Sequence, residues 1–384
     1  CGKGGNAVSF GQEHEKLSFP EAIKWIASYY KIALQETERS PEQQIVQQVE
    51  ESIRVINEFA TNHFQSNLWD TEDGLLIGQS YFKERGFSKE IIEQFRLGYS
   101  IQNNEQNDLL KALTLKGFSI EYALKSGIIK QKDDRLYDAY RGRVIFPIQN
   151  MTGRVLGFGA RILVKNDKAP KYINSPENEI YIKSKVLYGL YQARTHIAKL
   201  DECYLVEGYT DTITLHQCGI ENVVSSSGTA LTENQIRLIN RLTKNITILF
   251  DGDAAGIRAS IRGIDLILEQ GMNVKVCTFP VGEDPDSFAK DKNVDVVDQT
   301  KMLFVGTEAA LHRVRDVDTV VFLDIDQEIS APRYRAAEIT LTLIVHAARL
   351  VARKSSASSK SDGLVMIQSM LADHALLRGL AAND

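Results

Sequence analysis

Several features that define other protein classes are scarce or missing in this chain of 384 residues. The four cysteines, Cys1, Cys203, Cys218 and Cys277, form no C-x-x-C pair and have no disulfide-like spacing, which suits a reducing compartment. No apolar run reaches the roughly 18 residues of a membrane span, and the first residues lack the pattern of a secretory signal. We therefore expect a cytoplasmic protein that is not held together by disulfides and does not enter a membrane.

A phosphate-binding P-loop is also missing. The motif G-x-x-x-x-G-K-[ST] does not occur, and the Gly2-Lys3 pair near the start is followed by Gly4 instead of Ser or Thr. The chain is therefore not expected to be a P-loop ATPase or GTPase.

An excess of basic charge is missing from the chain as a whole, although it is present locally. The net charge of −5 argues against a uniformly basic nucleic-acid binder. The segment from Lys130 to Lys185, however, contains twelve Lys or Arg and six Asp or Glu, a local excess of six positive charges. This segment is either a solvated surface or a basic groove for a polyanion.

Apolar patterns change along the chain and predict more than one domain. Helical spacing appears around residues 19–30 and from 53 to 129, and the apolar runs 144–148 and 155–159 flank a turn, which predicts a β-hairpin. Between residues 203 and 280, β-rich runs at 203–206, 222–225, 246–250 and 274–279 alternate with helical patterns. The expected fold class is α/β, with a mixed α+β first part followed by a parallel sheet with crossover helices.

Acidic residues follow three of these predicted strands. They occur in Glu-Gly-Tyr-Thr-Asp, in Asp-Gly-Asp-Ala-Ala-Gly and in Asp-Pro-Asp, and they are Glu207, Asp251, Asp253, Asp284 and Asp286. The carboxyl ends of parallel strands form one edge of the sheet, so these acids are expected to converge there. Converging carboxylates either repel one another or hold a hard cation such as Mg²⁺, which suits nucleotide chemistry.

Each acid taken singly is more commonly a helix N-cap or a loop anchor. The set is more specific, because Gly208, Gly252 and Gly256 allow close approach of the backbone and Pro285 holds two acids on an extended turn. Together the three motifs predict a metal site.

At this point the chain resembles a known family. The three acidic motifs are similar to the three signatures of the Toprim domain of bacterial DnaG-type DNA primases. Upstream, residues 141–148, 157–161, 170–177 and 183–191 resemble the polymerase core of the same family. The similarity follows the family order from residue 1 to about residue 291.

The resemblance implies Mg²⁺-dependent synthesis of short RNA primers on single-stranded DNA from ribonucleoside triphosphates. It implies that Glu207, Asp251 and Asp253 are catalytic, and that these three together with Asp284 and Asp286 bind Mg²⁺ or Mn²⁺. It further implies a template and nucleotide groove in which Tyr172 stacks on a base and the cations follow phosphates. The groove residues it indicates are Arg143, Arg161, Lys171, Tyr172, Asn174 and Lys183.

The family pattern breaks at both ends. Cys1-Gly-Lys-Gly-Gly resembles the end of the primase zinc ribbon, with Cys1 as the last of four zinc ligands, but the other three ligands are not in this sequence. We therefore expect an incomplete Zn²⁺ site. The family's helical bundle and helicase-binding domain are not recognisable after the acidic motifs, so the replicative helicase is a partner of the family only.

The last ninety or so residues resemble a different protein. Residues 305–314, 322–328 and 331–338 are similar to the C-terminal part of an actinobacterial PriA-like primosomal protein, which implies a partial RecA-like α/β lobe fused to the primase. Asp324 and Asp326 in this tail are interpreted as structural residues at the end of a strand, not as a second metal site.

The expected domains are a zinc-ribbon remnant (1–35), a linker (36–52), the first part of the polymerase core (53–200), the Toprim domain (201–293) and the PriA-like tail (294–384). Two other functions stay open at this point. One is an inactive primase remnant that binds the replisome, and the other is a Toprim topoisomerase or nuclease that uses the same acids.

Overall fold

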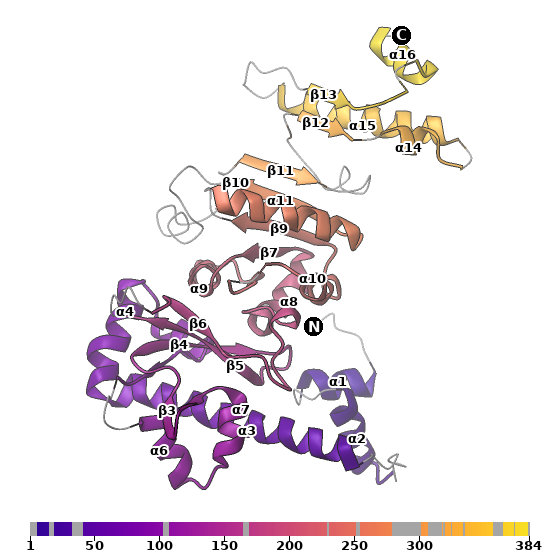
Figure 1. Ribbon diagram of the computed structural model, residues 1–384. Coiled ribbons are helices and arrows are strands. Elements are labelled where there is room, and N and C mark those ends of the chain that lie inside the picture. Colours follow the sequence, from indigo (N-terminus) through magenta and orange to yellow (C-terminus); the bar gives the residue numbers. More distant parts are fainter. Residues whose placement is uncertain are drawn as a thin grey trace. The chain divides into compact units, whose positions relative to one another are not determined.

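The computed structural model describes residues 6–14, 19–32, 41–102, 107–163, 169–228, 230–250, 254–278, 301–305, 317, 319–323, 325–332, 335–355, 364–371 and 373–382. The chain divides into two compact units, Cys1–Leu303 and Phe304–Asp384. Each unit is described separately below (Figure 1).

The first part of the larger unit is mostly helical and then becomes a sheet. Its helices are α1 (Ala7–His14), α2 (Phe19–Tyr29), α3 (Pro41–Asp70), the π-helical turn η1 (Gly74–Gly78), α4 (Gln79–Glu84), α5 (Lys89–Gln94), α6 (Asp108–Leu115), α7 (Ile120–Ser126), the 3₁₀ turn η2 (Lys183–Lys185) and α8 (Leu190–Leu200). Its strands are β1 (Gly98–Ser100), β2 (Ile129–Lys132), β3 (Arg135–Asp138), β4 (Arg143–Gln149), β5 (Val155–Ile162) and β6 (Tyr172–Asn174).

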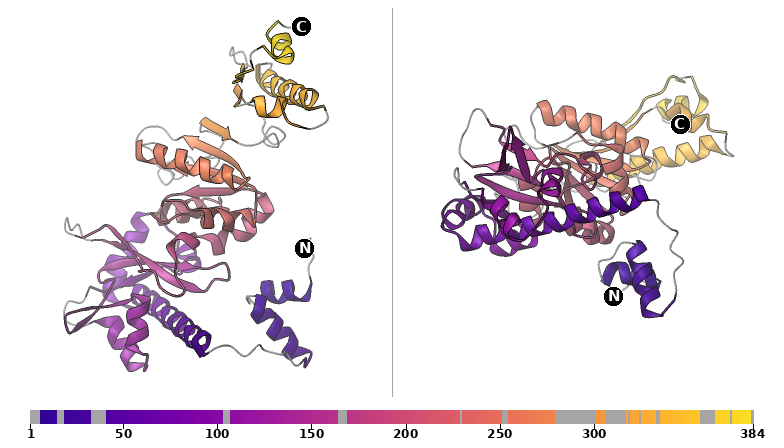
Figure 2. Two further views of the ribbon diagram at one scale, coloured as in Figure 1. Left: turned by 45° about the vertical axis from the view of Figure 1, so that its right-hand side comes forward. Right: turned by 60° about the horizontal axis from the view of Figure 1, so that its bottom comes forward.

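Helix α3 is long because its apolar residues keep helical spacing over several turns. Ile53, Ile56, Ala60, Phe64 and Leu68 are all buried and lie three or four residues apart, so they form one stripe. The stripe packs against the antiparallel sheet β1-β4-β5-β6, and α3 runs beside this sheet in both views of Figure 2.

Strand β1 crosses α3 at very short range. A Cβ atom at Gly98 would lie 2.6 Å from the Cβ of Phe64 and 2.8 Å from its carbonyl carbon. Only glycine fits there, which explains how a strand can lie directly on a helix.

The register of the antiparallel sheet decides which side chains share a face. Strand β5 pairs Arg161 with Tyr172 and Gly159 with Asn174 of β6. Because side chains alternate along a strand, residues 159 and 161 and their partners in β6 point to the same side. The hairpin of β4 and β5 predicted from the sequence is confirmed, with residues 143–149 paired to 155–162.

The parallel sheet comes next, and the division between the two units falls within its last strand, at residues 301–305. It contains β7 (Cys203–Val206), β8 (Val223–Ser225), β9 (Asn245–Phe250), β10 (Asn273–Thr278) and β11 (Lys301–Val305), with α9 (Tyr209–Gln217), α10 (Glu233–Asn240) and α11 (Ala254–Glu269) between them. The strand order is β11-β10-β9-β7-β8, and the pairs β7–β8, β7–β9 and β9–β10 are parallel. The predicted α/β class, with four apolar runs forming a parallel sheet, is confirmed.

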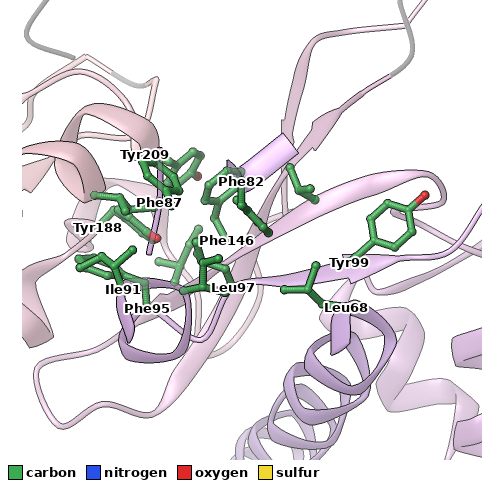
Figure 3. Close-up of a cluster of buried hydrophobic side chains, with 14 of the residues drawn as sticks. Leu68, Phe82, Phe87, Ile91, Phe95, Leu97, Tyr99, Phe146, Tyr188 and Tyr209 are labelled. Carbon is green, nitrogen blue, oxygen red and sulfur yellow. The ribbon is translucent and has the colours of Figure 1, made fainter. Parts of the chain in front are cut away.

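One hydrophobic cluster joins the antiparallel sheet to helix α9, which follows the first strand of the parallel sheet. The ring of Tyr209, the first residue of α9, stacks on Phe146 of β4 with centroids 5.1 Å apart and an interplanar angle of 11°. Tyr188 meets the same tyrosine edge to face at 4.7 Å. Figure 3 shows Phe82 and Phe146 close to Tyr188 and Tyr209, with Phe87, Ile91 and Phe95 in the same cluster.

The smaller unit contains β12 (Thr319–Phe322), α14 (Ile325–Ile329), α15 (Ala336–Ser355), β13 (Leu364–Ile367) and α16 (Ala375–Ala382). Strands β12 and β13 are parallel, and a small cluster around Ile325, Ile329 and Ile344 forms the core. Both oxygens of the Asp326 carboxylate are used locally, one accepting from the Ser369 hydroxyl and the other from the Met370 N–H. This agrees with a structural role for Asp326, while Asp324 lies outside the described residues.

Two expected boundaries differ from the structure. Residues 41–52, assigned to a linker, are the first turns of α3, because a polar Glu- and Gln-rich sequence also forms helix when it continues into an amphipathic one. The expected boundary at 293 and 294 lies before β11, at residues 301–305, which joins the edge of the parallel sheet next to β10.

Candidate functional site

The site is built around the end of strand β7. Glu207 follows the last residue of that strand, and its Oε1 atom is buried from solvent. Its backbone carbonyl accepts a hydrogen bond from the N–H of Gly228, at 3.3 Å, which ties it to the chain leaving β8. The next residue, Gly208, is the N-cap of helix α9 and donates its N–H to the Asp211 carboxylate at 3.0 Å.

Sheet register relates Glu207 to strand β9, which precedes the second acidic motif in the sequence. Strand β7 pairs Leu205 with Ile248 of β9, and continuing that register brings Glu207 level with Phe250, the residue before Asp251. Asp251, Asp253, Asp284 and Asp286 themselves lie outside the described residues, as does Cys1. Among the residues that the structure does describe, no cluster of three or more His, Cys, Asp or Glu side chains is positioned to hold a metal.

Asn174 joins the antiparallel sheet to this edge. Its Oδ1 accepts from the Tyr209 hydroxyl at 2.8 Å, and its Nδ2 donates to the carbonyl of Ser227 at 3.2 Å. The predicted groove residue therefore also fixes the turn after β8 against β6. A Cβ atom at Gly159 would lie 2.4 Å from Cζ of Tyr209, so the glycine leaves the space that the tyrosine ring occupies.

A small pocket opens where these elements meet. It is lined by side chains of the antiparallel sheet, of the segment around the turn η2 and of the residues that follow β8, namely Ile148, Asn174, Tyr181, Lys183, Val186, Tyr188, Ser226 and Ser227. Burial raises the pKa of Tyr188 well above its ordinary value, so its hydroxyl remains protonated. The pocket thus presents neutral hydroxyl and amide groups beside one lysine.

Arg161 is held between two tyrosine rings. Its Nη1 donates to the hydroxyl of Tyr81 at 2.6 Å and to that of Tyr172 at 3.2 Å. The guanidinium carbon lies 4.9 Å from the ring centroid of Tyr81 and 5.4 Å from that of Tyr172, within the range of cation–π attraction. Tyr81, on α4, was not predicted from the sequence, because nothing in its local pattern indicates a partner 80 residues away.

The structure brings together some predicted groove residues and separates another. Arg161, Tyr172 and Asn174 share one face of the antiparallel sheet, Lys171 is exposed next to Tyr172, and Lys183 lines the pocket. Arg143 is the first residue of the adjacent strand β4, and its side chain is only 6% exposed. Arg161 is paired with Val144, the residue after Arg143, so the side chains of Arg143 and Arg161 lie on opposite faces of the sheet. Its Nη1 donates to the carbonyls of Pro170 and Lys171, so the side chain braces the segment that leads into β6.

The remaining sequence features have plain structural explanations. Cys203, Cys218 and Cys277 form no disulfide within the part of the chain that the structure describes. Burial raises the pKa of Cys203 above its ordinary value, which keeps this thiol unreactive. In the part of the chain that is described, no helix is long and apolar enough to span a membrane.

Comparison with known proteins identifies both sheets. A family model described as the N-terminal domain of the DNA primase catalytic core matches residues 63–194, and a Toprim-like model matches residues 204–289. A DNA primase of Halalkalibacterium halodurans is 40% identical over 290 residues, which cover 75% of this chain and 47% of that protein. The chain therefore spans about half the length of the curated relatives it matches.

Solved structures give the same result. The zinc-binding and RNA polymerase domains of Aquifex aeolicus primase superpose with a TM-score of 0.61 at 30% identity, covering 92% of this chain and 81% of that one. A DnaG primase catalytic domain bound to single-stranded DNA gives a TM-score of 0.61 at 29% identity, covering 78% and 91%. On these similarities, which extend through both sheets in the same order, the chain belongs to the family of bacterial DnaG-type DNA primases.

Proposed function

We propose that this protein is a nucleotidyltransferase that synthesises short RNA primers on single-stranded DNA from ribonucleoside triphosphates. The observation that carries the proposal is the junction of the two sheets. The strand end bearing Glu207 is tied through Gly228, Ser227 and Asn174 to the face that carries Arg161 and Tyr172. The proposed metal-binding end of the parallel sheet and the cationic, aromatic surface of the antiparallel sheet are thus held in a fixed position relative to each other, as template-directed polymerisation requires.

Glu207, Asp251, Asp253, Asp284 and Asp286 are proposed to hold Mg²⁺ or Mn²⁺. The donor set fits a hard divalent cation, since it consists of carboxylates and one oxygen of Glu207 is already withdrawn from water. When bound, the cation supplies charge neutralisation for a triphosphate and activation of a primer hydroxyl. The protein contributes the fixed position of Glu207, because both its backbone and the following helix are anchored by hydrogen bonds.

The template strand is proposed to bind along the face of β5 and β6. Tyr172 offers an aromatic surface for a base, while Arg161, Lys171 and Lys183 follow the phosphates. Asn174 and Lys183 lie at the pocket next to the proposed metal-binding end of the parallel sheet, so we assign them to the incoming nucleotide or the strand end. The buried Arg143 is assigned a supporting role in the same surface through the segment before β6.

The finer parts of the expected architecture remain proposals. We propose that residues 1–35 are the remnant of a zinc ribbon in which Cys1 is a ligand of an incomplete Zn²⁺ site. We also propose that the smaller unit is a PriA-like fragment with no chemistry of its own, and that the protein acts in the cytoplasm. The replicative helicase is a partner of the family, and no helicase-binding region is assigned here.

A primer-synthesis assay tests the main proposal. The full chain is incubated with single-stranded DNA, the four ribonucleoside triphosphates and Mg²⁺, and the expected products are short RNA chains that disappear when Mg²⁺ is chelated. Binding of DNA without synthesis would instead identify an inactive remnant. Cleavage of the DNA strand in place of synthesis would identify a topoisomerase or nuclease.

Lys171→Ala and Lys183→Ala are expected to weaken the binding of single-stranded DNA of every sequence to a similar degree. A lysine that contacts a phosphate contributes to affinity without reading the base, and removing it should flatten the dependence of log affinity on log salt by about 0.7 per contact. The measurement is fluorescence anisotropy with labelled oligonucleotides between low and moderate salt. A matched control is Lys125→Ala, since Lys125 pairs with Glu121 on α7. A slope equal to that of the unaltered protein would assign the two lysines to the solvated surface.

A further inference from the structure

Tyr81 makes the shortest contact with an arginine of the proposed template surface. The distance from its hydroxyl oxygen to Nη1 of Arg161 is 2.6 Å, against 3.2 Å for the same nitrogen and Tyr172. Helix α4, which carries Tyr81, is fixed by its neighbour Phe82, a fully buried residue that packs on Phe87 and Phe146. The tyrosine is therefore a rigid anchor, whereas Tyr172 lies on the short edge strand β6.

The contacts of Arg161 leave its charge uncompensated. Both hydrogen-bond partners are tyrosine hydroxyls, and within the described residues no carboxylate lies at ion-pair distance from this guanidinium. Other arginines of the same unit are neutralised, as Arg96 is by Glu58 at 2.6 Å. Burial raises the pKa of Tyr81 to about 12, so the phenol stays neutral at physiological pH and does not become an anion that would compete with phosphate.

The donor inventory of Arg161 points in the same direction. A guanidinium has five N–H donors, and the hydrogen bonds of Arg161 to Tyr81 and Tyr172 both start from Nη1. Among the described residues, no atom accepts a hydrogen bond from Nε or Nη2 of Arg161. The edge of the guanidinium that carries these two nitrogens can therefore donate two parallel hydrogen bonds to a phosphate.

We propose that Tyr81 is a positioning residue for template binding, which holds the guanidinium of Arg161 in the orientation that grips a DNA phosphate. This inference rests on the proposed primase function. Tyr81 does not itself contact the nucleic acid in this scheme. Its role is to keep Arg161 in place when the ring of Tyr172 moves to stack on a base, because the tie to α4 does not depend on β6.

The decisive variant is Tyr81→Phe, which removes the hydroxyl and keeps the ring. Loss of a hydrogen bond to a charged group is expected to weaken binding of a labelled oligonucleotide about tenfold. It should raise KM for the template by a similar factor while kcat stays within about twofold, since only binding of the template is affected. Tyr137→Phe is the matched control, because Tyr137 lies on β3 with Arg141 5.3 Å from its ring and outside the proposed surface.

A double-mutant cycle separates positioning from a merely structural role. In an Arg161→Ala background, Tyr81→Phe should weaken binding no further and should leave the salt slope unchanged. An equal additional loss in that background would overturn the inference, as would a Tyr81→Phe variant that matches Tyr137→Phe. If the unaltered protein neither binds single-stranded DNA nor makes primers, the proposed function itself is wrong, and the inference about Tyr81 is lost with it.

Discussion

Glu207→Gln is expected to abolish primer synthesis while leaving the fold intact. The substitution removes the negative charge from the edge of the parallel sheet with almost no change of shape, and the loss of one essential metal contact should lower the rate by about 100-fold or more. Asp251→Asn should have the same effect, because Asp251 belongs to the same proposed set of metal ligands and follows strand β9, the neighbour of β7. The measurement is the rate of ribonucleotide incorporation at saturating Mg²⁺, together with the melting temperature.

The matched control for Glu207→Gln is Glu233→Gln. Glu233 forms an exposed pair with Arg237 one turn further along α10, at 3.0 Å, and such surface pairs contribute little to stability. Its removal should leave the rate unchanged. A Glu207→Gln protein that kept near-normal synthesis would show that this carboxylate is not part of the metal site, even if Asp251→Asn were inactive.

Cutting the chain at two neighbouring positions should give opposite results. A protein ending at residue 305 keeps all five strands of the parallel sheet, so its main unfolding transition and its stabilisation by Mg²⁺ should match those of the full chain. A protein ending at residue 293 lacks β11 and exposes the edge of β10. Its melting temperature should fall by about 5–10 °C, and it should aggregate more readily.

Calorimetry with and without Mg²⁺ on the two shortened proteins and the full chain distinguishes the cases. Equal melting temperatures for the two shortened proteins would mean that β11 adds nothing to the sheet and that the boundary expected from the sequence, at 293, is the correct one. A loss of the Mg²⁺ effect in both would mean that the smaller unit is needed for the site.

The elements that could be predicted from the sequence are buried ones, because burial requires apolar residues and these form a recognisable pattern along the chain. The hairpin of β4 and β5 and the four strands β7 to β10 are almost wholly buried or flanked by turns, so their composition indicates strand directly. Strand β11 was assigned instead to the tail, because the sequence similarity to primases weakens there and a single five-residue run carries little periodicity of its own. Helix α3 starts earlier than expected for a comparable reason, since its first turns are polar.

Only part of the candidate site could be predicted from the sequence. Glu207 and the residues Arg161, Tyr172 and Asn174 stand in motifs, and the structure places the last three on one face. Arg143 belongs to an equally recognisable motif but points to the other side of β4, because a shift of one residue along a strand reverses the direction of the side chain. Tyr81, in contrast, stands in no recognisable motif and yet contacts Arg161. The contact exists only because α4 packs beside β5.

The stacking of Tyr209 on Phe146 limits how the two sheets can move relative to each other. The helix that begins two residues after Glu207 starts inside the core of the antiparallel sheet, where Tyr209 is also bonded to Asn174. A hinge motion between the two sheets would have to remove the ring of Tyr209 from the packed interior and break the hydrogen bond of its hydroxyl, which costs several kcal/mol. Opening and closing of the two sheets against each other is thereby disfavoured. Under the proposed function, the nucleic acid would advance by one nucleotide across a protein surface that does not move. Amide protons of β4, β5, β7 and β9 should accordingly exchange with solvent through one common event, the unfolding of the whole core.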